Sequence, residues 1–399
     1  MPETTPSATE SANPSAGVFR AIGPVFFYFF VAGIATVMLG PLLPALIARW
    51  HIQDGQAGTL FTVVFVGELC GAWFATRNLR GSVFIGSCMT AAGCGLMALA
   101  NFGIAHVALF SVGLGLGAGL TAGNVIVGTA ATSSRTRLLA LLNVSWGVGA
   151  IACSLLVRLC GPGRVNLFFL LLAGCLLLSA IVALRIPRAA SQEISRETSE
   201  AEREERHKSL KKPPMPLVPL LIFSFAMLLF VGIENSLGGW LPSYGTRTTT
   251  LLASSVALYF WIAELSGRLL LAALTSLFGE AALYRGSVLL LILTTAILIA
   301  ATHLGSSGVV ALTILSGLAL APIYPLIVSF FLARTGNHPH VGPVFAMASL
   351  GGATLPWLTG VVSTHFHTLR NGLAVPAIGA ILLLLLSSEI TAGQTNRQA

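Results

Sequence analysis

The sequence predicts an all-α membrane protein with twelve transmembrane helices in two pseudo-symmetric six-helix bundles. Of its 399 residues, 55% are hydrophobic and only 9% are charged, whereas a soluble domain carries about 25% charged residues. Long apolar runs recur along the whole chain, and each bilayer crossing needs about 20 such residues. Short motifs of the first half also return in the second. These observations exclude a water-soluble enzyme.

Apolar runs between polar or Gly/Pro punctuation define the spans in chain order. We predict spans at 24–48, 56–76, 81–101, 105–129, 137–160, 166–185, 217–242, 250–274, 283–303, 308–333, 341–362 and 370–388. The corresponding domains are an N-terminal tail (1–20), a first bundle (21–185), a charged linker (186–216), a second bundle (217–390) and a C-terminal tail (391–399).

The basic residues set the expected orientation, because cytoplasmic loops are enriched in Lys and Arg. With both termini inside, sixteen of the 22 Lys and Arg residues lie on the cytoplasmic side, including the linker cluster. Five lie outside, namely Arg49, Arg158, Arg164, Arg247 and Arg370. We therefore expect a multi-pass protein of the plasma (bacterial inner) membrane. The net charge of +8 reflects this topology, and no nucleic-acid partner is expected.

The two halves share short motifs in the same order. The string GELCG at 67–71 matches AELSG at 263–267, and GIAT at 33–36 matches GIEN at 232–235. A weaker match joins SWGVGA at 145–150 to SLGGA at 349–353. The offset between matches stays near 200 residues, which indicates a duplicated six-helix unit.

Several longer strings resemble a known transporter family. They are FVGIENSLGGWLPSY (230–244), ELSGRLL (264–270), SGLALAPIYPLIVS (316–329) and LGGATLPWLTG (350–360). With twelve spans in two halves, the chain resembles the major facilitator superfamily, and its second half resembles the fucose permease and sodium-dependent glucose transporter branch. The resemblance implies a secondary active transporter. The sequence departs from that branch because spans one and four carry no acid, and Leu120 lies near the expected span-four position.

Away from the span ends, four charged residues fall inside the spans, where each costs about 2.5–3.5 kcal/mol at a helix centre. Glu264 and Arg268 are four residues apart, so they share a helix face and form a predicted pair. That pair is interpreted as a structural or gating contact, with proton coupling through Glu264 as the alternative. Glu68 has no partner within its span, so it is either neutral and hydrogen-bonded or a proton carrier.

The fourth charged residue, Glu234, is the main candidate for substrate contact. It lies beside Asn235 on span seven, where a carboxylate and an amide supply the acceptors and donors that sugar hydroxyls need. Trp240 follows and could stack on the apolar face of a sugar ring. The alternative is that Glu234 bonds a neighbouring helix and Trp240 anchors the membrane interface.

The resemblance also implies that spans one, four, seven and ten line the substrate cavity. It adds Thr36, Asn124 and Tyr324 as candidate substrate-binding residues, and a packing role is the alternative for each. Asn143 and Trp146 on span five are further candidates.

The sequence shows no phosphate loop, metal-ligand cluster or nucleophile–base pair, and the six cysteines have no metal-binding spacing. The expectation is therefore no cofactor, with H⁺ or Na⁺ as the coupling ion.

The favoured function is gradient-driven transport of a small polar solute, a monosaccharide such as a hexose, by a monomer among membrane lipids. Proton-driven export of drugs or other amphiphiles is the alternative, and a non-transporting membrane sensor is the least favoured.

Overall fold

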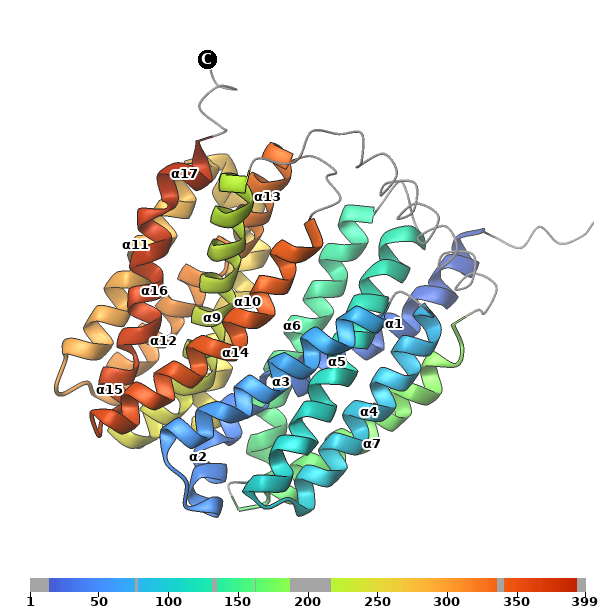
Figure 1. Cartoon of the computed structure of the whole chain (residues 1–399), viewed down its shortest axis with the longest axis horizontal. Helices are drawn as coiled ribbons and strands as arrows, with labels where there is room; N and C mark the ends of the chain where they lie inside the picture. The colour runs from blue at the N-terminus through green and yellow to red at the C-terminus, as the bar shows by residue number, and fades with distance from the viewer. Residues whose placement is uncertain are drawn as a thin grey trace, which may run out of the picture.

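The computed structural model describes residues 14–75, 78–130, 135–161, 163–186, 217–335 and 341–392. Every regular element in these ranges is an α-helix, and the helices stand roughly alongside one another in two groups (Figure 1). The predicted linker 186–216 lies outside the described residues apart from Ile186, as do residues 1–13 and 393–399 of the predicted tails. The all-α prediction is confirmed.

The first group contains the helices that precede the linker. They are α1 (Pro14–Val37), α2 (Leu39–Trp50), α3 (Asp54–Phe74), α4 (Leu79–Leu99), α5 (Phe102–Ala130), α6 (Arg135–Cys160) and α7 (Val165–Ala183).

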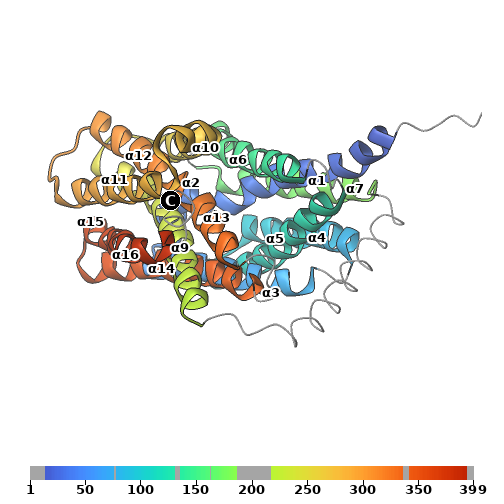
Figure 2. The ribbon, with the colours of Figure 1, turned by 90° about the horizontal axis from the view of Figure 1, so that it is seen from above.

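The second group follows the linker. It comprises α9 (Leu217–Thr248), α10 (Ala253–Phe278), α11 (Glu280–Ala300), α12 (Ser306–Leu320), α13 (Ile323–Thr335), α14 (Val341–His365), α15 (Leu369–Gly372), α16 (Ala374–Leu385) and α17 (Ser387–Thr391). The view from above shows the two groups side by side (Figure 2).

Each predicted span coincides with a helix or with a broken pair of helices. Within the described residues, nine helical stretches are long and apolar enough to cross a membrane, with α12 and α13 counted as one, and α1 with α2 adds a tenth as one bent span. Helix α14 and the shorter apolar stretch Leu369–Leu385 occupy the last two predicted spans. Helix length and hydropathy thus account for ten of the twelve predicted crossings.

Two spans are interrupted near their middle. Helices α1 and α2 meet at a bend of 41° beside Met38, and α12 gives way to α13 around Ala321 and Pro322. Proline lacks an N–H and clashes with the preceding turn, so it breaks a helix. Broken helices are tolerated at membrane depth where protein or a water-filled cavity surrounds the freed backbone groups.

Glycines allow the helices of the first group to approach closely. A Cβ placed on Gly113 or Gly117 of α5 would lie 1.9 Å from the carbonyl oxygen of Val64 or Glu68 on α3. No side chain can occupy that space, so the two backbones meet directly. Small residues commonly allow such close approach between membrane helices.

The two groups converge at one end of the molecule. We call this the Asp54 end, and α3 and α10 begin there (Figure 1). We call the opposite end the terminal end, where α9 begins and α17 ends (Figure 1). Helix α3 of the first group packs along α14 of the second (Figure 1). Gly58 of α3 lies so near Trp357 of α14 that a Cβ would fall 2.8 Å from the Trp357 Cα.

Candidate functional site

A cavity of about 380 Å³ lies between the two helix groups. Its walls come from α1, α3, α5 and α6 on one side and from α9, α10, α13 and α14 on the other. Nine of the eleven candidate residues line it: Thr36, Glu68, Asn124, Asn143, Trp146, Glu234, Asn235, Arg268 and Tyr324. Residues from distant parts of the sequence therefore share one polar chamber.

Three charged side chains form a cluster on the second-group wall. Arg268 Nη2 donates to Glu234 Oε1 at 2.6 Å and also to Glu264 Oε1. The predicted Glu264–Arg268 pair is therefore present, and Glu234 from the neighbouring helix α9 joins it. Two carboxylates share one guanidinium, so the cluster carries a net negative charge when both acids are ionised.

Burial differs among the three members of this cluster. The Glu264 side chain is only 2% exposed, whereas that of Glu234 is 12% and that of Arg268 25% exposed. Glu264 Oε2 and Arg268 Nε are buried without a hydrogen-bond partner among the described residues. Glu234 and Arg268 thus face the cavity, while Glu264 lies behind them and does not line it.

Glu68 lines the cavity from the first group. Its position is set by the α3–α5 contact, since its carbonyl oxygen packs directly against Gly117. The contacts found among the described residues include no hydrogen bond or ion pair to its carboxylate. Among the described residues, Glu68 is thus an acid that lines the cavity and has no cationic partner.

Three asparagines that line the cavity make the same hydrogen bond to their own helices. Asn124, Asn143 and Asn235 each donate from Nδ2 to the carbonyl oxygen four residues earlier, at 3.0, 2.9 and 2.9 Å. Each amide so engaged keeps its carbonyl oxygen and its second N–H for other partners. With the carboxylates, these oxygens make the cavity rich in hydrogen-bond acceptors.

Aromatic rings also contribute to the walls. Trp146 of α6 meets Trp261 of α10 edge to face at 5.9 Å, which joins the two groups beside the cavity. Tyr324 lies beside Phe230, with ring centroids 5.5 Å apart. Such rings offer apolar faces next to polar groups, an arrangement that suits a ligand with both characters.

Trp240 lies outside this cavity. It is fully buried, its Nε1 donates to the carbonyl oxygen of Pro356 at 2.9 Å, and its ring lies 6.4 Å from that of Phe61. The expected stacking on a substrate ring is absent from this arrangement, because α14 and α3 cover the indole. Trp240 instead fills the space between the cavity and the Asp54 end.

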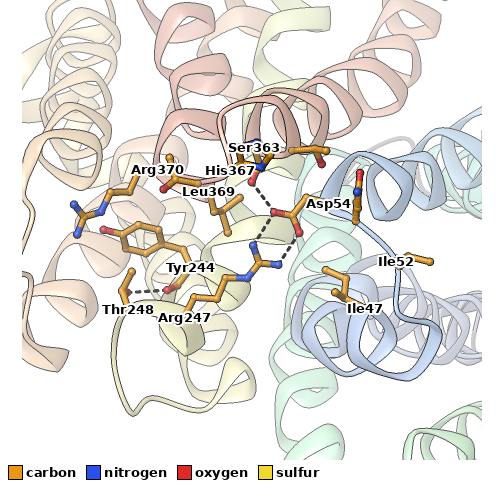
Figure 3. A pocket seen from close by; sticks show the side chains of 13 residues that line it. Ile47, Ile52, Asp54, Tyr244, Arg247, Thr248, Ser363, His367, Leu369 and Arg370 are labelled. Carbon is orange, nitrogen blue, oxygen red and sulfur yellow. Dashed lines mark hydrogen bonds and ion pairs between the residues drawn. The ribbon is translucent and has the colours of Figure 1, made fainter.

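An ion-pair hub closes the Asp54 end. Asp54 accepts two hydrogen bonds from Arg247 of α9, at 2.6 and 2.7 Å, and one from Ser363 Oγ of α14 at 2.5 Å (Figure 3). Next to it, the Gly55 N–H donates to Thr364 Oγ1 at 2.8 Å. A bidentate Arg–carboxylate pair is among the stronger polar contacts, so this hub joins the two groups firmly.

A second cavity, of about 520 Å³, lies around the hub at the molecular surface. Its walls include Tyr244, His367 and Arg370 besides the hub residues (Figure 3). Trp240 and Phe61 lie between it and the central cavity. The two cavities are therefore separated in this conformation.

Sequence reasoning missed several of these residues. Asp54 and Arg247 lie at span ends, where charged residues are common, so there was no reason in the sequence to choose them as site residues. The one feature that could have indicated their pairing is that they carry opposite charges and lie on different halves. Thr121, Ser349 and Trp261 also line the cavity, but no sequence feature distinguishes them from packing residues.

The described residues contain no group of three or more His, Cys, Asp or Glu side chains that could hold a metal ion.

Comparison with known proteins fixes the family. The family model of the Major Facilitator Superfamily matches residues 25–342. The chain belongs to the Major Facilitator Superfamily. It is therefore a transporter rather than an enzyme, an integral multi-pass membrane protein that binds small-molecule substrates.

Relatives and solved structures agree with this assignment. Bypass of stop codon protein 6 of Saccharomyces cerevisiae is 26% identical and aligns over 91% of this chain and 80% of its own length. A POT family transporter in complex with 5-aminolevulinic acid has a TM-score of 0.76 at 13% identity, covering 93% of this chain and 97% of its own. The E. coli fucose:proton symporter FucP has a TM-score of 0.62 at 18% identity, covering 93% and 98%. At these identities the structural likeness shows the fold.

Proposed function

We propose that this superfamily member is a secondary active transporter of a small, hydroxyl-rich solute of the monosaccharide class, driven by a proton gradient. The observation that carries the proposal is the acceptor-rich chamber between the two groups. Sugar hydroxyls are donors as well as acceptors, so they would pair with the oxygens of Asn124, Asn143 and Asn235. The edges of Trp146 and Trp261 supply the apolar contact.

Glu234 is the proposed principal contact to substrate. It faces the cavity and keeps one carboxylate oxygen, Oε2, outside the contact with Arg268. Arg268 holds the carboxylate in place, so the substrate meets an oriented acceptor. A charge-assisted hydrogen bond to an ionised carboxylate contributes about 1.5–3 kcal/mol.

Glu68 is the proposed proton carrier. Its carboxylate faces the cavity across from the cluster and has no cation to hold it ionised, so gain and loss of a proton change the charge of the chamber directly. The transporter branch that the second half resembles has acids on spans one and four. This chain lacks them, and Glu68 is proposed to take their role.

The closed Asp54 end suggests the direction in which the chamber opens. Under the orientation predicted from the basic residues, that end faces outside, so the conformation is inward-facing. The exposed amides of Asn124 and Asn143 lie on the terminal side of the chamber. Transport by a monomer would then alternate this state with one in which the hub at Asp54 is open.

One observation favours a second candidate function. Two acids, Glu68 and Glu234, line the chamber against a single arginine, Arg268, and its aromatic rings are large. A cationic amphiphile would pair with the acids and pack against the rings, so the second candidate is export of drugs of this class. The two candidates differ in the substrate that accumulates and in the direction of flux.

Uptake by purified protein in proteoliposomes tests the proposal. We expect labelled hexose to accumulate under an inwardly directed proton gradient, and Glu234→Gln to reduce the rate at least about tenfold through the lost hydrogen bond. Glu389→Gln, an exposed acid on α17 outside the cavity, is the matched control and should behave like the wild type. Proton-driven efflux of cationic dyes without hexose uptake would support the second candidate instead.

Coupling is tested separately from binding. We expect Glu68→Gln to retain substrate exchange between the two sides of the membrane but to lose accumulation driven by the gradient, because a neutral amide carries no proton. Replacing the proton gradient by a sodium gradient should not restore accumulation in the wild type. Loss of exchange in Glu68→Gln would assign Glu68 to substrate binding. If only Glu264→Gln lost gradient-driven accumulation, the proton carrier would be Glu264 in the charged cluster.

A further inference from the structure

A third cavity lies on the flank of the molecule near the Asp54 end. It has a volume of about 320 Å³ and is lined by α2, α6 and α7 of the first group and by α9 and α10 of the second. Most of its walls are apolar: Pro41, Leu42, Pro44, Ala45, Val157, Val165, Phe168 and Leu252. We call it the flank groove.

The flank groove is continuous with apolar surface of the kind that faces lipid. Leu155 and Leu159 on α6 are 45% and 83% exposed, and Leu252 at the start of α10 is 51% exposed. Exposed leucines on helices of a multi-pass protein lie against acyl chains. The groove therefore opens toward the bilayer rather than toward the central chamber.

Positive charge gathers at one end of the flank groove. Arg158 and Arg164 both line it, both are exposed, and no acidic residue is among the lining residues. The contacts found among the described residues give neither guanidinium a hydrogen bond or ion pair. Two arginines within seven residues of each other thus have free donors beside an apolar groove.

Two helix N-termini point to the same place. Helices α7 and α10 begin at Val165 and Ala253, and neither has a side-chain cap. The first N–H groups of a helix lack intrahelical partners and carry partial positive charge, so they bind phosphate groups. Val165 and Ala253 both line the groove, which places these donors next to the two arginines.

We infer that the flank groove binds an anionic phospholipid, with the phosphate between Arg158, Arg164 and the two helix N-termini and an acyl chain along the apolar wall. Guanidinium groups match phosphate geometry well. Because the walls come from both helix groups, the complete groove exists only while they are together at this end. A lipid bound there therefore stabilises the conformation with the Asp54 end closed.

Native mass spectrometry of the purified full chain tests the site. Protein exchanged into mixed micelles of phosphatidylglycerol and phosphatidylcholine should retain phosphatidylglycerol in preference, and Arg158→Gln/Arg164→Gln should retain one molecule fewer. Arg158→Lys/Arg164→Lys keeps the charge and should retain the lipid, which separates a lost site from a misfolded protein. Arg370→Gln removes one arginine at the same end outside the groove and should leave retention unchanged.

The conformational consequence has its own readout. In vesicles of phosphatidylcholine with phosphatidylglycerol, the wild type should show slower labelling of a cysteine at the Asp54 end than in phosphatidylcholine alone, and the Gln double variant should show no difference. Equal phosphatidylglycerol retention by the wild type and the Gln double variant would overturn the inference. Displacement of the retained lipid by inorganic phosphate alone would also overturn it, because the apolar wall would then contribute nothing.

Discussion

At the residue scale, the cluster of Glu234, Glu264 and Arg268 shows how charges are kept inside the membrane. One guanidinium contacts both carboxylates, so each acid has a cationic partner despite its burial. The desolvation of a buried charge costs several kcal/mol, and an excellent partner geometry is needed to offset it. Loss of Arg268 therefore leaves both acids without a cationic partner, whereas loss of one acid leaves the other still paired with it.

Arg268→Gln should destabilise the protein by about 3 kcal/mol, because it leaves Glu264 buried without a cation. The measurement is the unfolding temperature in detergent at pH 7.5. The double variant Glu264→Gln/Arg268→Gln should recover part of the loss, since two amides can hydrogen-bond one another. Equal stability of the single variant and the wild type would show that Glu264 is not held ionised by Arg268.

At the element scale, the contact between α3 and α5 determines where Glu68 lies. Gly113 and Gly117 leave room for the α3 backbone, and the helix would shift outward if either carried a side chain. Packing of small residues is a main source of helix association in membranes. The position of Glu68, the proposed proton carrier on α3, thus depends on glycines of α5.

Gly117→Val should lower the yield of folded protein and destabilise it by about 3 kcal/mol or more, because overpacking against a backbone oxygen is not relieved by a rotamer change. Size-exclusion chromatography with thermal denaturation in detergent measures both effects. Gly95→Val is the matched control, since a Cβ there meets nothing within 4 Å. A Gly117→Val protein as stable as Gly95→Val would contradict the close contact between α3 and α5.

At the scale of the whole molecule, the two groups meet tightly at the Asp54 end. The hub at Asp54, the covered Trp240 and the α3–α14 contact act together there. The proposed transport cycle requires these contacts to break in another conformation. The Arg247 side chain is 39% exposed and that of Asp54 10%, so water can replace this contact when the end opens.

Asp54→Asn should open this end more often, because the amide loses the charge-assisted bidentate contact with Arg247. The expected increase in labelling rate is about tenfold for a cysteine introduced as Ser243→Cys, a buried position on α9, in a background without the six native cysteines. Ser363→Ala removes a single hydrogen bond to the same carboxylate and should have a smaller effect. An unchanged labelling rate in Asp54→Asn would show that the hub does not hold this end closed.

Much of this was predictable from the sequence because its cause is local. Helices at the predicted spans follow from runs of apolar residues, which need no knowledge of their neighbours. The Glu264–Arg268 pair follows from helical spacing alone. The internal repeat also placed Thr36 and Asn235 at matching positions, and both line the chamber.

Other features depend on which helices lie side by side. Glu234 joins the Arg268 cluster because α9 packs against α10, and Asp54 meets Arg247 although 193 residues separate them. Trp240 has a sequence context that suits substrate contact, yet α14 covers it.

The sequence by itself determined the membrane-spanning class, the helical segments and the short set of charged residues inside them, because hydrophobicity and helical periodicity act over a few turns. Only the tertiary structure decided which of those residues share a chamber and which end of the molecule is closed. Such contacts join side chains that are far apart in the chain, and their geometry depends on the packing of whole helices.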